Sequence, residues 1–161
     1  MSRKKVEKIL FFSKTLDFLE HYLPDQSLKS RNTIETYRDA LTVFRRYITD
    51  TMNLSLRTFG FEDCTHDFLL SYIEFLHKNG NSETTCNSRL AAIRAYLWYA
   101  ADCDISLQSV ALTASRVPFL KVPKLTREVI PDDALKALLS APPDTKIGRR
   151  DRLILILVNA P

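Results

Sequence analysis

The apolar positions of residues 82–99 repeat at the spacing of one helical face. The segment reads SETTCNSRLAAIRAYLWY. Its apolar side chains recur every three or four residues and predict a helix with one core-facing stripe, formed by Cys86, Leu90, Ile93, Leu97 and Ala100. The opposite face carries small side chains, namely Thr84, Ser88, Ala91 and Ala95, flanked by Asn87 and Arg94. Such a face fits a neighbouring helix or, through its polar groups, phosphates and base edges.

Three more helices are predicted before this one. The first covers residues 6–23 and ends at Pro24, with an apolar face of Phe12, Leu16, Leu19 and Leu23. The second starts near Asn32, which has capping-box spacing to Glu35, and its apolar stripe comprises Ile34, Tyr37, Leu41, Phe44 and Ile48. The third covers about 66–78, between a Thr65 cap and the stop signal Asn79–Gly80. Four helices with short connections predict a compact all-α bundle of about 110 residues.

The second helix has a polar face that is rich in arginine. It carries Arg31, Glu35, Arg38, Thr42, Arg45 and Arg46. A solvated face is the ordinary meaning of this pattern. However, residues 29–33 also place cations and hydroxyls beside the free backbone N–H groups of a helix N-terminus, where phosphate binds readily.

Composition narrows the class of protein. The apolar share of 45% and the charged share of 26% are typical of a globular protein. No run of about 18 apolar residues is present, and the apolar stretch near the N-terminus is too short for a signal peptide, so we expect a cytoplasmic protein. Cys64, Cys86 and Cys103 show no metal-ligand spacing. We therefore expect no metal site. We also expect no cofactor and no small-molecule substrate.

The net charge of +4 comes from residues 115–161, because acidic and basic side chains balance over residues 1–114. Residues 114–131 contain three prolines and the cations Arg116, Lys121, Lys124 and Arg127. Proline keeps such a segment extended, so it can follow a phosphate backbone or act as a plain tether. We assign a domain to 1–114, a basic linker to 115–130, and the start of a second domain to 131–161. There Pro131 opens one helix and the apolar run 153–158 predicts another.

These features together resemble the tyrosine recombinase (phage integrase) family, particularly integrases of bacterial mobile elements. The resemblance rests on four motifs in the family's order, namely residues 30–37, 82–96, the linker from Val122, and Gly148–Leu157. It implies that residues of about 10–104 form a core-binding, SAM-like domain. It also implies that residues 131–161 are the first two helices of an incomplete catalytic domain.

The resemblance implies a catalytic set that we do not find in this sequence. In the family this set is an arginine, a lysine, a His-x-x-Arg element and a nucleophilic tyrosine. The chain stops at Pro161, before the first arginine is expected, and none of its six tyrosines matches the nucleophile. Attack on a DNA phosphodiester needs cations that hold the non-bridging oxygens. We therefore expect a truncated chain that is not an enzyme on its own.

The resemblance leaves binding of double-stranded DNA as the expected function. The expected contact residues are Lys29, Arg31, Thr33, Arg38, Thr84, Asn87, Arg89, Arg94, Lys121 and Lys124. Asn87 and Arg94 are expected to reach base edges, and the others phosphates. Two alternatives stay open. In the first, the chain is a protein-interaction or dominant-negative fragment that joins a full-length recombinase assembly, which is a tetrameric synapse in the family, with Phe11 as an exposed contact. In the second, it is the non-functional product of a split gene.

Overall fold

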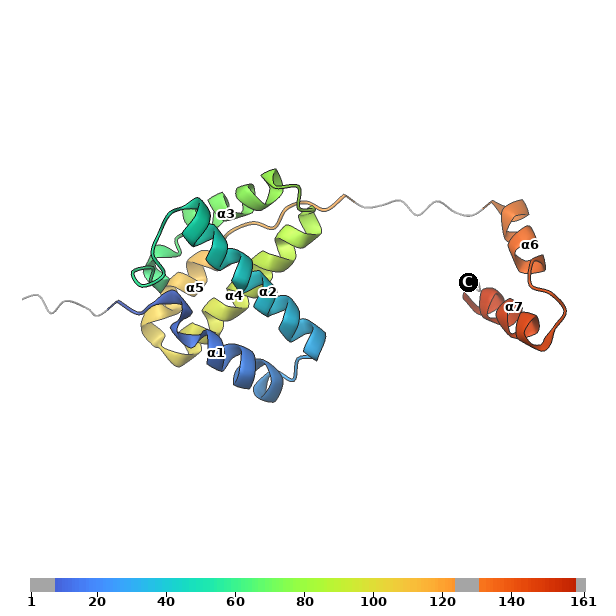
Figure 1. The fold of residues 1–161 in the computed structure, drawn as a ribbon, viewed down its shortest axis with the longest axis horizontal. Coiled ribbons are helices and arrows are strands. Elements are labelled where there is room, and N and C mark those ends of the chain that lie inside the picture. The colour runs from blue at the N-terminus through green and yellow to red at the C-terminus, as the bar shows by residue number, and fades with distance from the viewer. Residues whose placement is uncertain (1–7, 124–130, 159–161) are drawn as a thin grey trace, which may run out of the picture. The chain divides into compact units, whose positions relative to one another are not determined.

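The computed structural model describes residues 8–123 and 131–158. The chain divides into unit 1, Met1–Val122, and unit 2, Pro123–Pro161. The regular elements of the described residues are all helices (Figure 1), which confirms the expected all-α class. None of these helices is long and apolar enough to cross a membrane.

The first helical segment changes its winding along its length. A 3₁₀ turn at Phe11–Lys14 leads into α1 (Thr15–Asp17), and π-helical turns continue over Phe18–Gln26. Pro24 therefore lies inside the helix, and the prediction that it ends the helix was wrong. Leu16, placed on the apolar face by the 3.6-residue pattern, is 68% exposed. The reason is that the 3₁₀ and π turns rotate the side chains away from that period.

Helices α2 and α3 follow on either side of a short irregular connection. α2 (Arg31–Arg46) is capped by Ser30, whose Oγ accepts a hydrogen bond from the Thr33 amide at 3.3 Å, so Asn32 is not the cap. π-helical turns extend α2 over Tyr47–Thr51, and a 3₁₀ turn forms at Phe61–Asp63. α3 (His66–Lys78) begins after Thr65 and ends at Asn79–Gly80, with Gly80 at φ 77°, as predicted.

Helix α4 (Glu83–Cys103) is the centre of unit 1 and contacts α2, α3 and α5 (Figure 1). Its predicted stripe of Cys86, Leu90, Ile93, Leu97 and Ala100 is fully buried, and Ala92, Tyr96, Tyr99 and Ala101 are buried as well. The Tyr96 hydroxyl donates to the Phe11 carbonyl at 2.5 Å and accepts from the Lys14 amide at 3.3 Å. This hydroxyl therefore ties the first helical segment to the central helix.

Helix α5 (Gln108–Ser115) was not predicted from the sequence. It follows a 3₁₀ turn at Ile105–Leu107 and has only eight residues, too few for a periodic pattern to stand out. It packs on α4 by burying Ala111 and Ala114. The chain then buries Val117 in the same core, so the first residues of the expected linker pack on unit 1.

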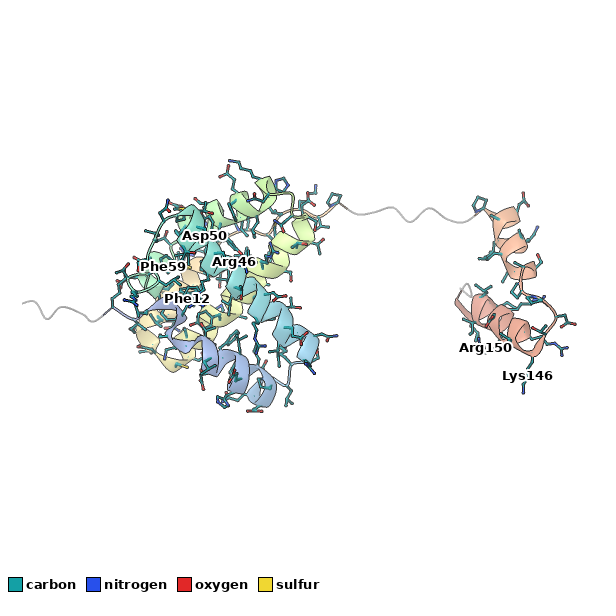
Figure 2. All side chains as sticks on the ribbon, viewed as in Figure 1. Phe12, Arg46, Asp50, Phe59, Lys146 and Arg150 are labelled. Atoms are coloured by element: carbon teal, nitrogen blue, oxygen red, sulfur yellow. The ribbon has the colours of Figure 1, made fainter. Side chains whose placement is uncertain are left out.

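Unit 2 contains the two helices that the sequence predicted, α6 (Asp132–Ser140) and α7 (Lys146–Val158). They contact one another, and the Arg152 side chain on α7 donates to the Pro142 carbonyl at 2.9 Å. Lys146 and Arg150 lie on the first turns of α7 (Figure 2). The apolar run of α7 leaves Leu153, Ile154, Ile156 and Leu157 between 49% and 66% exposed.

Candidate functional site

The exposed face of α2 concentrates positive charge. It carries Arg31, Arg38, Arg45 and Arg46, the last of which is labelled in Figure 2. Residues seven apart lie about two turns apart, so Arg31, Arg38 and Arg45 follow one line along the helix. Of these four arginines, only Arg31 has an ion-pair partner among the described residues, namely Glu35, with Nε 3.2 Å from Oε1. This face therefore presents three arginines whose charge no carboxylate of the described chain pairs.

A small hollow of about 150 Å³ separates this arginine line from the first helical segment. It is lined by Phe12, Thr15, Leu19, Arg38, Leu41, Thr42 and Arg45. The guanidinium carbon of Arg45 lies 5.6 Å from the centroid of the Phe12 ring, a cation–π contact that restrains the arginine. Arg38 and Arg45 thus flank one hollow. Arg45 was not among the expected contacts, although its seven-residue spacing from Arg38 was a signal that could have found it.

A larger groove of about 380 Å³ lies between α2 and the start of α4. It is lined by Thr36, Asp39, Ala40, Thr84, Thr85, Ser88 and Arg89. Two expected contacts, Thr84 and Arg89, are therefore brought together here, and Arg89 also donates to Asn81 Oδ1 at 2.8 Å. Two residues of the small-residue face of α4, Thr84 and Ser88, border this groove, and both are exposed.

The N-termini of α2 and α4 share one arrangement of hydroxyl groups. In each, a serine cap and a threonine three residues later lie 2.9 Å apart through their side-chain oxygens, as Ser30 with Thr33 and Ser82 with Thr85. Each serine also accepts from the backbone amide of its threonine at 3.3 Å. Lys29 and Arg31 are exposed beside the first of these termini. The expected contacts Lys29, Arg31 and Thr33 are thus close in space as well as in sequence.

Asn87 and Arg94 bind the chain's own backbone. The Asn87 side chain donates to the Leu120 carbonyl and accepts from the Leu120 amide, both at 2.8 Å. The Arg94 guanidinium donates to the carbonyls of Ala114 and Val117. Both side chains are half-buried, and burial lowers the pKa of Arg94. Their expected contact with base edges stays a prediction, and the structure gives them a different set of partners.

The remaining expected residues have simpler surroundings. Lys121 is exposed directly after Leu120, whereas Lys124 lies outside the described residues. Phe11 is 0% exposed and contacts Phe44, Phe61 and Tyr96, so its expected role as an exposed protein contact was wrong. Within the described ranges no group of His, Cys, Asp or Glu side chains could hold a metal ion.

Comparison with known proteins identifies the family. Residues 14–112 match the phage integrase SAM-like domain. A Sinorhizobium fredii protein named as an integrase/recombinase is 30% identical over 87% of this chain and 52% of its own length. Tyrosine recombinase XerC of Myxococcus xanthus is 29% identical over 91% of this chain and 46% of its own length. The chain thus spans about half the length of these relatives, and no solved structure matches it.

The matched region begins in the first helical segment and ends in α5, so it covers nearly all the helices of unit 1. It contains the arginine face of α2, the groove between α2 and α4, and the N-termini of both helices. The expected resemblance is therefore confirmed: the chain belongs to the phage integrase (tyrosine recombinase) family, and unit 1 carries its SAM-like N-terminal domain.

Proposed function

We propose that this chain is the DNA-binding portion of a site-specific tyrosine recombinase or integrase and that it clamps duplex DNA for recombination. One observation carries the proposal. Arg38, Arg45 and Arg46 are exposed on one helix and have no ion-pair partner among the described residues. Unpaired arginines along a helix face suit the regularly spaced phosphates of a duplex. The membership in a recombinase family supports the same function.

The proposed interface extends from α2 to the start of α4. Phosphate contacts come from Lys29, Arg31, Thr33, Arg38, Thr84, Arg89, Lys121 and, from the sequence alone, Lys124, to which we add Arg45 and Arg46. The hydroxyls in the groove, Thr84 and Ser88, donate to phosphate oxygens without adding charge. Asp39 also lines the groove, and its negative charge opposes phosphate binding close to it.

We also propose that residues 1–161 hold DNA without cutting it. A nucleophilic tyrosine must reach the phosphodiester and lose its proton. Tyr47, Tyr72, Tyr96 and Tyr99 are buried, and Tyr22 and Tyr37 are partly buried against the core. Burial raises the pKa of Tyr96 to about 12, which opposes the loss of its proton near neutral pH. The surroundings of these tyrosines oppose a nucleophilic role and so support the proposal that residues 1–161 bind DNA without cutting it.

A titration of labelled duplex DNA at several salt concentrations tests the binding proposal. The full chain is expected to bind the duplex and to lose affinity steeply as salt rises, because each phosphate contact releases a counterion. Arg38→Ala and Arg45→Ala are each expected to weaken binding and to lower the slope of log K against log salt by about one.

Arg57→Ala is the matched control. Arg57 is an exposed arginine outside α2 and α4, so its removal changes the net charge equally but leaves the proposed face intact. If all three variants bind alike, the general positive charge of the chain explains the affinity and the α2 face is not the interface. If the full chain does not bind at low salt, the proposal is wrong.

Unit 2 supports a second use, contact with another polypeptide. Leu153 and Leu157 of α7 are 57% and 66% exposed, and exposed apolar side chains that gather on one helix mark interaction surfaces. In this alternative the chain joins a recombinase assembly through α7. The alternative gains support if the chain fails to bind duplex DNA yet sediments as more than a monomer.

A further inference from the structure

The segment that follows α5 is held along α4 by side-chain contacts to its backbone. The first contact is made by Asn87, which pairs with both backbone polar groups of Leu120 at 2.8 Å. This is the pairing that a neighbouring β-strand would offer to an extended residue. A single side chain therefore fixes the position and the direction of the backbone at Leu120.

The second contact is made by Arg94 at the C-terminal end of α5. Its Nε donates to the Ala114 carbonyl at 3.0 Å, and its Nη2 donates to the Val117 carbonyl. Carbonyls at a helix C-terminus lack partners within the helix and favour a positive charge. The ring of Phe119 covers the guanidinium, with its centroid 4.5 Å from Cζ. Arg94 therefore joins the end of α5 to the extended residues after it.

A third contact lies on the same side of α4. The indole N–H of Trp98 donates to Ser115 Oγ at 3.0 Å. Val117, two residues after Ser115, is 1% exposed. Asn87, Arg94 and Trp98 are separated by seven and four residues, so they lie along one helical face. This face is occupied by residues 114–120, which are the last two residues of α5 and the five that follow; we call them the strap. Lys121 follows the strap directly and is exposed.

We propose that Asn87 and Arg94 are positioning residues that dock the strap on α4 and thereby hold Lys121 in place for DNA. The proposal rests on the proposed function, because it assigns the strap a purpose in binding. An undocked strap would have to be ordered when DNA binds, and each residue that is fixed then costs conformational entropy. Docking removes this cost before DNA arrives.

The proposal differs in a measurable way from direct contact with DNA. A positioning residue makes no phosphate contact, so its loss weakens binding without changing the number of counterions released. A phosphate contact would lower the salt slope by about one when it is removed. The two roles are therefore separated by the slope of log K against log salt.

The experiment uses the full chain and the variants Asn87→Ala, Arg94→Ala and Arg94→Lys. Hydrogen exchange of the Leu120 amide, measured without DNA, reports docking directly, because Asn87 accepts from this amide. We expect exchange at least about tenfold faster in all three variants. Lysine keeps the charge but lacks the planar fork that reaches two carbonyls. DNA affinity is expected to fall about three- to tenfold with an unchanged salt slope.

Arg116→Lys is the control, because Arg116 lies on the strap, is exposed, and its side chain has no hydrogen bond within the described part of the chain. We expect this variant to match the original chain in both measurements. The far-UV circular dichroism of every variant checks that the helices are intact.

Every other result of these measurements contradicts one step of the strap proposal. Unchanged Leu120 exchange in the Asn87 and Arg94 variants overturns docking. Faster exchange with unchanged DNA affinity overturns the positioning role, and a salt slope lowered by about one in Arg94→Ala makes Arg94 a phosphate contact. If the original chain does not bind duplex DNA, the proposed function fails together with the role of the strap in binding. A protected Leu120 amide would then still support docking by itself.

Discussion

Two buried tyrosines in the core of unit 1 differ in what their hydroxyls contact. Both Tyr72 and Tyr96 are 0% exposed. The Tyr96 hydroxyl donates to the Phe11 carbonyl and accepts from Thr15 Oγ1 at 3.3 Å. The Tyr72 hydroxyl is buried without a hydrogen-bond partner among the described residues. A buried polar group without a partner destabilises the folded state, whereas one with partners stabilises it modestly.

Tyr96→Phe and Tyr72→Phe are therefore expected to have opposite effects on stability. Tyr96→Phe leaves the Phe11 carbonyl and the Lys14 amide without their partner and should lower the free energy of unfolding by about 1–3 kcal/mol. Tyr72→Phe removes an unpaired hydroxyl and should be neutral or stabilising by up to about 1 kcal/mol. Urea denaturation followed by circular dichroism measures both. A loss of stability in Tyr72→Phe like that in Tyr96→Phe would show that the Tyr72 hydroxyl has a partner.

The sequence predicted which residues lie in the core better than it predicted which residues contact one another. The periodic pattern placed Leu90, Ile93 and Leu97 inside, and all three are buried. It could not show that Arg94, which lies between them in sequence, binds carbonyls about twenty residues away. Periodicity reports which face of a helix a side chain occupies, but the partner on that face comes from another part of the chain.

At the scale of the element, hydroxyl side chains set where α2 and α4 begin. Ser30 and Ser82 both have extended backbone dihedrals, and each accepts a hydrogen bond from the amide three residues later. Asn32 has the right chemistry for a cap but lies in the first turn of α2. A residue inside the first turn has helical dihedrals, so its side chain is not placed to accept from the following amides.

Ser30→Ala and Asn32→Ala distinguish these two positions. Ser30→Ala removes the acceptor of the Thr33 amide and should destabilise unit 1 by about 1 kcal/mol. Asn32→Ala replaces an exposed helix residue by the best helix former, so its effect should stay within about 0.5 kcal/mol. Thermal unfolding of both variants beside the unchanged chain provides the measurement. A larger effect for Asn32→Ala would identify Asn32 as the cap after all.

At the scale of the whole molecule, the core of unit 1 extends from Phe11 to Val117. Its last member, Val117, lies beyond the predicted domain end at residue 114 and is 1% exposed. The contacts of the chain place the division between the two units after Val122. The strap therefore belongs to the folding unit of α1–α5, although its composition resembles a linker.

Two shortened chains test this boundary. Residues 1–122 should unfold cooperatively with nearly the same midpoint as unit 1 in the full chain, because the core cluster lies entirely within them. Residues 1–114 lack Val117, so Arg94 loses the Val117 carbonyl, and Asn87 loses both of its contacts to Leu120. Burial of a valine contributes about 1.5–3 kcal/mol, so we expect this shorter chain to be less stable by at least that amount. Equal stability of the two chains would mean that the strap is only a tether.

The sequence by itself determined the all-α class, the core stripe of α4, the limits of α3 and the recombinase family. These features depend on local periods, caps and short motifs, which are encoded in neighbouring residues. The tertiary structure alone decided that Phe11 is buried, that α5 forms, and that Asn87 and Arg94 hold the strap. Each of these depends on side chains that are distant in sequence and meet only when the chain folds. The face of α4 that the sequence left open between protein and DNA is therefore divided, with the strap along one side and the groove beside α2 along the other.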